Sequence, residues 1–297
     1  MNIRTDLAVE SGELRSAADQ EGFSETKETE GGIRLSRIKI TTPQAAKRIG
    51  KPEGTYITIF FDGAFSDDGL FQQAIQITAR ELKALLPEKG CVLAAGLGNG
   101  QMTSDALGPK TIDRLLVTRH IKQELPEIYR ELALGELAAI KPGVLGQTGI
   151  ESAELIHAAA EKVQPDCILV FDALASRKTE RLCTTVQISD TGITPGSGVG
   201  NHRTALRKEE FGVPVIGIGI PTVIDAVTMT LDTLSEVGKA EGAQEKISPY
   251  RKNLIVTPRD IDMLINRSVV LLSTAVNKAI HGNLSQEEIN ALAGGCA

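Results

Sequence analysis

The feature that most constrains the fold of this chain is a series of short apolar runs separated by stretches of helical periodicity. Continuous apolar runs occupy Cys91–Leu97, Cys167–Phe171 and Val213–Ile220, and such runs are typical of strands buried on both faces of a parallel sheet. Residues 67–86 and Ile150–Val163 carry apolar side chains at helical spacing. The alternation predicts an α/β fold, with a mostly parallel twisted sheet flanked by helices on both faces.

The remaining segments extend this core at both ends. Further strands are expected at Gly32–Thr41, Tyr56–Phe61 and Leu182–Ile188, and C-terminal helices between about 258 and 294. Residues 1–30 are polar and acidic, which indicates a mobile or surface-draped segment. We expect one domain over residues 7–297, made of an N-terminal extension (7–50), a core (54–240) and a C-terminal helical part (241–297).

Composition and charge exclude several classes of function. Lys and Arg total 32 against 38 Asp and Glu, a net charge of −6, which argues against direct binding of nucleic acid. Aromatic residues make up 3% of the chain and Trp is absent, so no stacking platform for single strands is expected. Because the sequence lacks an apolar stretch of membrane-spanning length and a signal peptide, we expect no membrane partner and a cytoplasmic location.

Aspartates follow the predicted strands of the core. They are Asp62, Asp105, Asp172 and Asp225. Catalytic groups of open α/β sheets gather at the carboxyl ends of the strands. Asp172 directly follows a buried run and should emerge at the strand tip, whereas Asp105 lies in a Gly-rich loop after another buried strand. If these two strands are neighbours, both carboxylates face one crevice; Asp62 and Asp225 are more typical of turns.

A close pair of carboxylates is sufficient equipment for peptide hydrolysis. Two such groups cannot both ionise cheaply, so one keeps its proton as an acid while the other acts as a base on a water molecule. The structural alternative for each aspartate is a helix N-cap or a turn. A non-catalytic protein that binds a small anion with its Gly-rich loops is a further alternative.

Other catalytic schemes lack their signatures in this sequence. There is no GxSxG nucleophile elbow and no P-loop. Cys91 and Cys167 lie in apolar runs, which favours buried thiols over nucleophiles. The ligand spacing of structural zinc sites is absent, and a looser site made of carboxylates and one His stays open.

Five blocks of the central region form the most specific pattern in the sequence. They are LAAGLGNGQMTSDALGP (93–109), PGVLGQTGIESAE (142–154), ILVFDALASR (168–177), TGITPGSGVGNHR (191–203) and GIGIPTVIDA (217–226). In this order they resemble the germination proteases of endospore-forming bacteria, which are atypical aspartic endopeptidases. The resemblance implies that the two catalytic aspartates fall on Asp105 and Asp172. It also implies a phosphorylase/hydrolase-like fold, related to hydrogenase maturation endopeptidases.

Those relatives hold a metal with acidic residues at related positions. A metal-dependent maturation endopeptidase is therefore the alternative function that the resemblance leaves open.

The N-terminus resembles that family's processing site in RTDLAVE (4–10). Family substrates are cut after an acidic residue that is followed by an aliphatic residue or Phe, then Ala, any residue and Glu. Asp6-Leu7-Ala8-Val9-Glu10 fits this pattern. The resemblance thus implies a zymogen that processes itself between Asp6 and Leu7, with residues 1–6 as propeptide. The alternative is a mobile tail that happens to match.

The resemblance also implies partners. Small acid-soluble spore proteins would be the substrates, in the spore core during germination, and the enzyme would be a homotetramer without a cofactor. Arg177 and Arg203 are candidates for binding the acidic residue before the scissile bond, with solvated surface charges as the alternative. The Gly-rich loop 191–203 is either a substrate-binding flap or a flexible surface loop.

Overall fold

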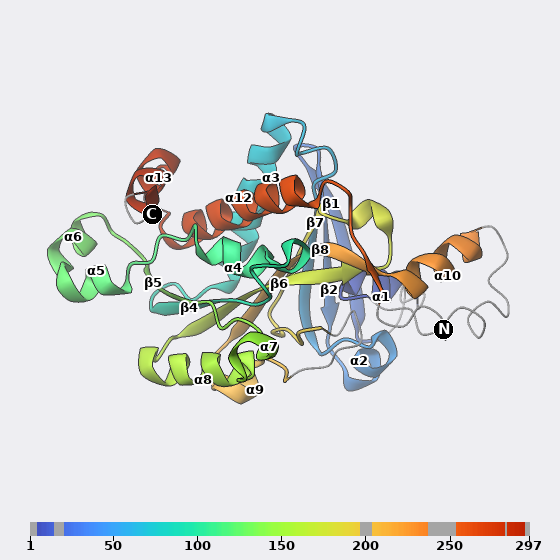
Figure 1. The fold of residues 1–297 in the computed structure, drawn as a ribbon, viewed down its shortest axis with the longest axis horizontal. Coiled ribbons are helices and arrows are strands. Elements are labelled where there is room, and N and C mark those ends of the chain that lie inside the picture. Colours follow the sequence, from blue (N-terminus) through green and yellow to red (C-terminus); the bar gives the residue numbers. More distant parts are fainter. Residues whose placement is uncertain (1–4, 15–20, 197–203, 237–253, 283, 295–297) are drawn as a thin grey trace.

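A computed structural model describes residues 5–14, 21–196, 204–236, 254–282 and 284–294. Within these residues the centre of the molecule is a nine-stranded sheet in the order β1-β2-β3-β7-β8-β6-β4-β5, with β9 paired to β8 (Figure 1). The strands are β1 (Phe23–Glu30), β2 (Ile33–Ile40), β3 (Gly54–Phe60), β4 (Cys91–Gly96), β5 (Glu136–Ile140), β6 (Cys167–Ser176), β7 (Thr185–Ser189), β8 (Val215–Asp225) and β9 (Ile255–Val256).

The sheet combines a parallel half with an antiparallel half. Strands β8, β6, β4 and β5 run parallel to one another. The antiparallel half runs from β1 through β2 and β3 to β7, which pairs antiparallel with β8. The predicted α/β class is confirmed, and the buried apolar runs form its parallel half. The shorter strands expected around this core build the antiparallel half.

Helices cover both faces of the sheet (Figure 1). On one face lie α3 (Asp68–Leu85), α4 (Leu107–Ile112) and α12 (Ile261–Ile280), and on the other lie α2 (Pro43–Ile49) and α8 (Ser152–Val163). The remaining helices are α1 (Ala8–Leu14), α5 (Arg119–Glu124), α6 (Pro126–Glu131), α7 (Leu145–Thr148), α9 (Lys208–Phe211), α10 (Ala226–Glu236) and α13 (Gln286–Gly294), with the short 3-10 helices η1 (Thr103–Asp105) and η2 (Thr179–Arg181).

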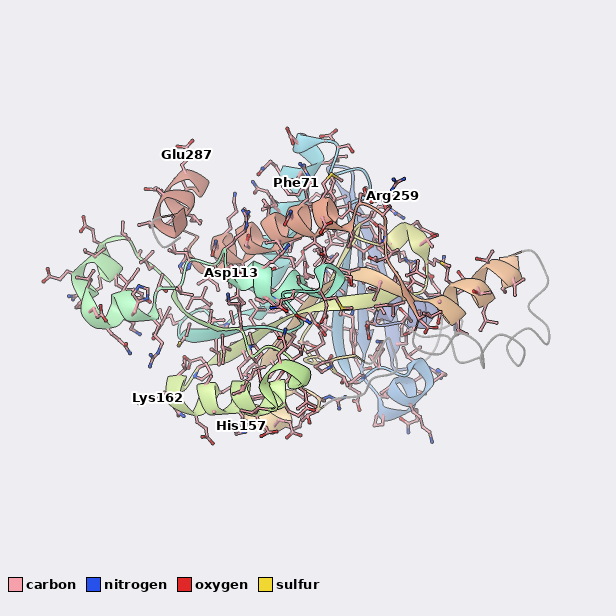
Figure 2. All side chains as sticks on the ribbon, viewed as in Figure 1. Phe71, Asp113, His157, Lys162, Arg259 and Glu287 are labelled. Atoms are coloured by element: carbon pink, nitrogen blue, oxygen red, sulfur yellow. The ribbon has the colours of Figure 1, made fainter. Side chains whose placement is uncertain are left out.

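The helices begin and face the sheet as their sequences dictate. The Asp67 carboxylate accepts a hydrogen bond from the Leu70 N–H and so caps α3 at its start. In α8 the buried Ile156 faces the sheet, whereas His157 and Lys162 lie on its exposed outer side (Figure 2). The described part of the chain contains no helix with the length and apolar character needed to cross a membrane.

Two of the parallel strands are longer than the apolar runs predicted. Strand β6 continues past Phe171 to Ser176, and β8 pairs with it over the same stretch, with a bulge between Leu174 and Ala175. Asp172 therefore lies inside β6, so its expected place beyond the strand tip was wrong. Aspartate is disfavoured in strands, but the backbone pairing with β8 overrides that local preference.

The N-terminal segment, residues 5–14, is docked on the body of the protein. Leu7 and Ala8 have no exposed surface, and the neighbouring residues as far as Ser11 are also buried. Leu7 packs with Ile49, Tyr56 and Leu174 in a small apolar cluster beside β2 and β3. The expectation of a mobile or surface-draped terminus was therefore wrong for these residues, and also for Phe23–Glu30, which form β1. Residues 1–4 and 15–20 lie outside the described residues.

Candidate active site

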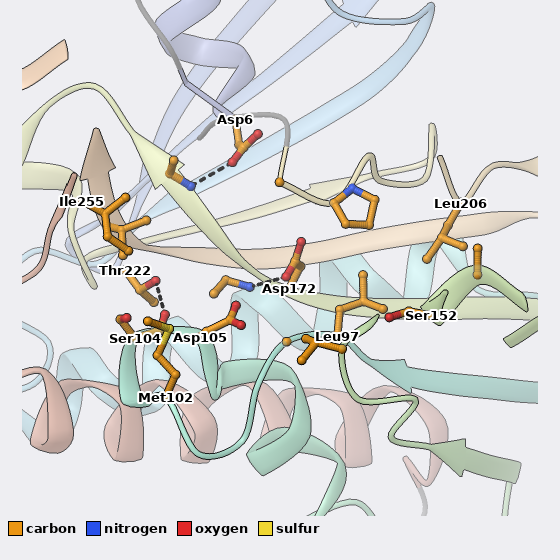
Figure 3. A pocket seen from close by; sticks show the side chains of 18 of the residues that line it. Asp6, Leu97, Met102, Ser104, Asp105, Ser152, Asp172, Leu206, Thr222 and Ile255 are labelled. Carbon is orange, nitrogen blue, oxygen red and sulfur yellow. Dashed lines mark hydrogen bonds between the residues drawn. The ribbon is translucent and has the colours of Figure 1, made fainter. Parts of the chain in front are cut away.

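A cavity of about 220 Å³ lies beyond the carboxyl end of β4 and beside the outer part of β6. Three aspartates from separate parts of the chain line it: Asp6 from the N-terminal segment, Asp105 from η1 and Asp172 from β6 (Figure 3). Its walls include Leu97, Met102, Ser152, Leu206 and Thr222. The cavity thus joins the two strand-end carboxylates to the terminus of the same chain.

Asp172 reaches the cavity because of the order and register of the strands. Strands β4 and β6 are neighbours, with Gly96 paired to Phe171, and the Leu97 N–H donates to the Phe171 carbonyl at 2.8 Å. Strand β4 ends at this level while β6 continues, so Asp172 faces the space beyond β4. The residue is 7% exposed, and one of its carboxylate oxygens accepts a hydrogen bond from the Ala173 N–H at 2.9 Å.

Asp105 is held by a tight loop that follows β4. Its carboxylate accepts a hydrogen bond from the Asn99 N–H at 2.7 Å. Gly98 has φ +107°, and a Cβ there would lie 2.1 Å from the Asp105 carbonyl oxygen, so this close return requires glycine. The loop is also tied to β8, because the Thr222 hydroxyl donates to the Ser104 carbonyl at 2.6 Å.

The two carboxylates therefore sit on rigid supports around one space. A buried Asp172 and a half-buried Asp105 thus present two carboxylates to one cavity, which is the equipment that acid–base work on a water molecule requires. Among the residues that the structure describes, no group of three or more His, Cys, Asp and Glu side chains is arranged to hold a metal ion.

The buried cysteines are not suited to act as thiolate nucleophiles. Burial raises the pKa of the Cys91 thiol to about 11 and that of Cys167 to about 12. Both side chains are buried and free of disulfides. At neutral pH both thiols stay protonated, so neither is suited to act as a nucleophile, and neither lines the cavity.

Asp6 enters the cavity region as part of a backbone pairing. Its N–H donates to the Ala175 carbonyl, and its carboxylate accepts from the Ala175 N–H, both at 2.8 Å. The carbonyl of Asp6, which belongs to the bond with Leu7, accepts from Lys51 Nζ at 2.8 Å and from Gln187 Nε2 at 3.0 Å. This carbonyl is therefore polarised by an ammonium group and an amide.

Strand register explains how Gln187 reaches this carbonyl. Gln187 of β7 pairs with Gly219 of β8, and Gly219 pairs with Asp172 of β6. Directly paired residues point to the same face of a sheet, so Gln187 and Asp172 share one face with a side-chain-free position between them. The side-chain oxygen of Gln187 holds the segment two residues beyond Asp6, since the Ala8 N–H donates to Gln187 Oε1 at 2.6 Å.

The other residues singled out by sequence lie elsewhere. The Arg177 guanidinium forms an ion pair with Asp232 of α10. Asp62 lies in a turn and pairs with Arg34 at the surface. Asp225 accepts from the Thr228 N–H at the start of α10, as a helix cap does. Arg203 lies outside the described residues.

Sequence reasoning missed three residues that hold the N-terminal segment: Lys51, Arg181 and Gln187. Lys51 and Arg181 lie in polar stretches without any motif. The one available signal was Gln187 itself, a long amide in the otherwise short-chained or apolar strand Thr185–Ser189.

Comparison with known proteins gives one consistent family. A family model described as germination protease matches residues 4–243. The germination protease of Caldanaerobacter subterraneus subsp. tengcongensis is 41% identical, with 98% of each chain covered. That of Clostridium perfringens is 39% identical, over 97% of this chain and 98% of the relative.

Among solved structures, a NiFe hydrogenase maturation protease from Thermococcus kodakarensis is similar over 66% of this chain and 98% of its own. Its TM-score is 0.37 and its sequence identity 17%, so it carries no argument about function. The curated relatives match almost from end to end. The chain therefore belongs to the germination protease family and is a protease.

Proposed function

We propose that the protein is an aspartate-dependent endopeptidase in which Asp105 and Asp172 share the acid–base work. The observation that carries the proposal is that both carboxylates line one cavity with Asp6. Asp6 precedes the peptide bond that fits the cleavage pattern of the family. A candidate catalytic pair and a candidate scissile segment thus lie in one place.

In the proposed reaction, one aspartate accepts a proton from a water molecule as the water oxygen attacks the Asp6 carbonyl carbon. The other aspartate donates a proton to the Leu7 nitrogen as the C–N bond breaks. Between these two events, negative charge develops on the Asp6 carbonyl oxygen. Lys51 and Gln187 already donate to the Asp6 carbonyl oxygen, and donors in this position stabilise such a charge. We assign the two roles to the pair rather than to either aspartate alone.

We further propose that the chain is made as a zymogen and processes itself between Asp6 and Leu7. Residues 1–6 would then be a propeptide on a single peptidase domain, 7–297. The docked state of the segment supports this, because Asp6 lines the cavity together with Asp105 and Asp172.

The proposed substrates are small acid-soluble spore proteins, degraded in the spore core at the start of germination by a homotetramer. Membership of the germination protease family supports this role. Sedimentation of the purified protein tests the assembly, with a mass about four times that of the chain as the expected result.

The central test is cleavage by the full-length chain. We would follow self-processing by mass spectrometry, and turnover of a peptide containing Thr-Glu-Ile-Ala-Ser-Glu, in the native chain and in Asp105→Asn and Asp172→Asn variants. Each variant should lose about 10²- to 10⁴-fold in rate, the usual contribution of a general acid or base. Asp62→Asn is the matched control, because Asp62 is a strand-end aspartate that pairs with Arg34 at the surface.

The same assay with EDTA separates the metal-dependent alternative. Activity that survives EDTA and vanishes in both variants supports the aspartate dyad. Activity lost to EDTA and restored by a metal ion would replace the dyad with a metal-dependent maturation-type endopeptidase. Full activity in either Asp→Asn variant contradicts the shared role.

A further inference from the structure

A buried carboxylate lies four residues beyond Asp6, outside the cavity. Glu10 has no exposed surface. Its carboxylate accepts hydrogen bonds from the Arg177 N–H at 2.6 Å and the Lys178 N–H at 3.1 Å. An oxygen of the same carboxylate lies 3.0 Å from Arg181 Nη1 in an ion pair. We call these three groups the Glu10 socket: the Arg181 guanidinium and the N–H groups of residues 177 and 178.

The socket is part of the protein body rather than of the N-terminal segment. Residues 177 and 178 follow the end of β6, and Arg181 ends η2. The Arg181 side chain is 10% exposed and also contacts Glu13 at 2.6 Å. A buried guanidinium beside two inward N–H groups is a built binding site for the Glu10 carboxylate, and the second guanidinium nitrogen holds Glu13.

The segment from Asp6 to Glu10 is bound to the body at three successive points. The Asp6 carboxylate accepts from the Ala175 N–H, the Leu7 side chain fills the apolar cluster with Tyr56 and Leu174, and Glu10 fills its socket. These contacts run outward along the continuation of β6, starting at the cavity that holds Asp172. The arrangement is that of a peptide held by consecutive subsites next to a catalytic centre.

The energetics favour recognition over simple anchoring. Removing a carboxylate from water costs free energy that its partners only offset, so apolar residues anchor a segment at least as well. A buried socket of donors, by contrast, discriminates strongly against any residue that leaves the donors unpaired. A socket of this kind therefore contributes to the selection of a particular side chain more than to the strength of binding.

We propose that the Glu10 socket is a substrate subsite, which binds a glutamate carboxylate four residues after the acidic residue that precedes the scissile bond. The chain's own Asp6–Glu10 occupies this subsite as a tethered peptide of the same chemistry. Arg181 is then a specificity-determining residue, and substrate binding requires the segment beyond Asp6 to leave the socket. This inference rests on the proposed endopeptidase function.

The first experiment measures selectivity with two peptides, one with the sequence of residues 3–13 and one with Glu10→Gln in that sequence. The native full-length chain should cleave the Glu peptide with a kcat/KM about 10- to 100-fold higher, as expected for hydrogen bonds to a charged group. In Arg181→Gln this ratio should fall below about 3-fold. Arg181→Lys should retain part of it, since the positive charge stays.

Arg34→Gln is the matched control and should leave the ratio unchanged. Arg34 is an exposed arginine that lines the same surface hollow as Arg181. A ratio that survives in Arg181→Gln, with both peptides slowed equally, would mean that Arg181 only supports the fold and would overturn the subsite.

A binding experiment separates failure of the subsite from failure of the protease function. In the full-length chain with Glu10→Lys, the like charge beside Arg181 should expel the segment from the socket. Fluorescence anisotropy of the labelled Glu and Gln peptides then reports occupancy without cleavage. Tighter binding of the Glu peptide, lost on adding Arg181→Gln, supports the subsite even if neither peptide is cut. Equal binding of both peptides, or none, overturns it whether or not cleavage occurs.

Discussion

Replacement of Leu7 by Ala should release the N-terminal segment without unfolding the protein. Leu7 has no exposed surface and packs into the cluster that contains Ile49, Tyr56 and Leu174. Loss of a buried leucine side chain costs about 2 to 4 kcal/mol when the transfer and cavity contributions are combined. Because the segment docks on a surface formed by other elements, this loss should fall on local opening rather than on global stability.

Hydrogen exchange measured by mass spectrometry tests this expectation. The Ala8 N–H is bonded to Gln187 Oε1 at 2.6 Å and the Ser11 N–H to the Leu7 carbonyl at 3.2 Å, so both amides report opening of residues 5–14. A loss of about 2 to 4 kcal/mol corresponds to exchange faster by roughly 30- to 1,000-fold. Leu125→Ala is the control, because Leu125 is 51% exposed.

Two results would refute the reasoning. Unchanged exchange in residues 5–14 would mean that Leu7 contributes nothing to docking. Equal acceleration in β4 and β6 would mean that the segment opens only when the whole protein unfolds.

Three further outcomes are expected from the described geometry. Burial lowers the pKa of His281 to about 4, so between about pH 4 and 6.5 the unfolded chain binds more protons than the folded chain. The free energy of unfolding should therefore fall by about 3 kcal/mol as pH drops through this window. Urea unfolding at several pH values measures this dependence, which His281→Gln should abolish. The fourth cysteine, Cys296, lies outside the described residues, so the thiol measurement uses a Cys296→Ser variant. In its native state this variant should not react with Ellman's reagent at pH 8, since burial raises the pKa values of the other three thiols to between about 11 and 12. Urea should expose all three, and rapid labelling of the native protein would contradict their burial. The thiols are those of Cys91, Cys167 and Cys183. Gly98→Ala should displace Asp105 and slow self-processing by about 10²-fold, while Gly100→Ala, whose Cβ would meet only Pro109 at 3.6 Å, should leave the rate nearly unchanged.

The elements that sequence predicted well are those fixed by local patterns. The helix expected over 67–86 is α3, Asp68–Leu85, and the run Cys91–Leu97 is β4, Cys91–Gly96. In both, the spacing of apolar residues matches the burial in the structure. The outer half of β6 was missed because its pairing with β8 depends on residues distant in sequence, which no local pattern contains.

The meeting of Asp105 and Asp172 in one cavity followed from a topological rule, although one of its premises was wrong. The rule that ligands gather at the carboxyl ends of parallel strands required only that β4 and β6 be neighbours, which they are. Asp172 nevertheless lies within its strand. It faces open space because the neighbouring β4 ends earlier, so unequal strand lengths produce the cavity that a strand tip was expected to provide.

Burial of the N-terminal segment was beyond the reach of sequence because its acidic residues acquire partners from far along the chain. Glu10 is paired across 168 residues with the Lys178 N–H, and it becomes compatible with burial only once that partner and Arg181 are in place.

The same contacts affect how the proposed activation would proceed. Asp6 lines the cavity, whereas Leu7 and Glu10 are held beyond it. In the proposed processing, a cut between Asp6 and Leu7 would leave Glu10 in its socket, so loss of residues 1–6 and release of the socket would be separable steps.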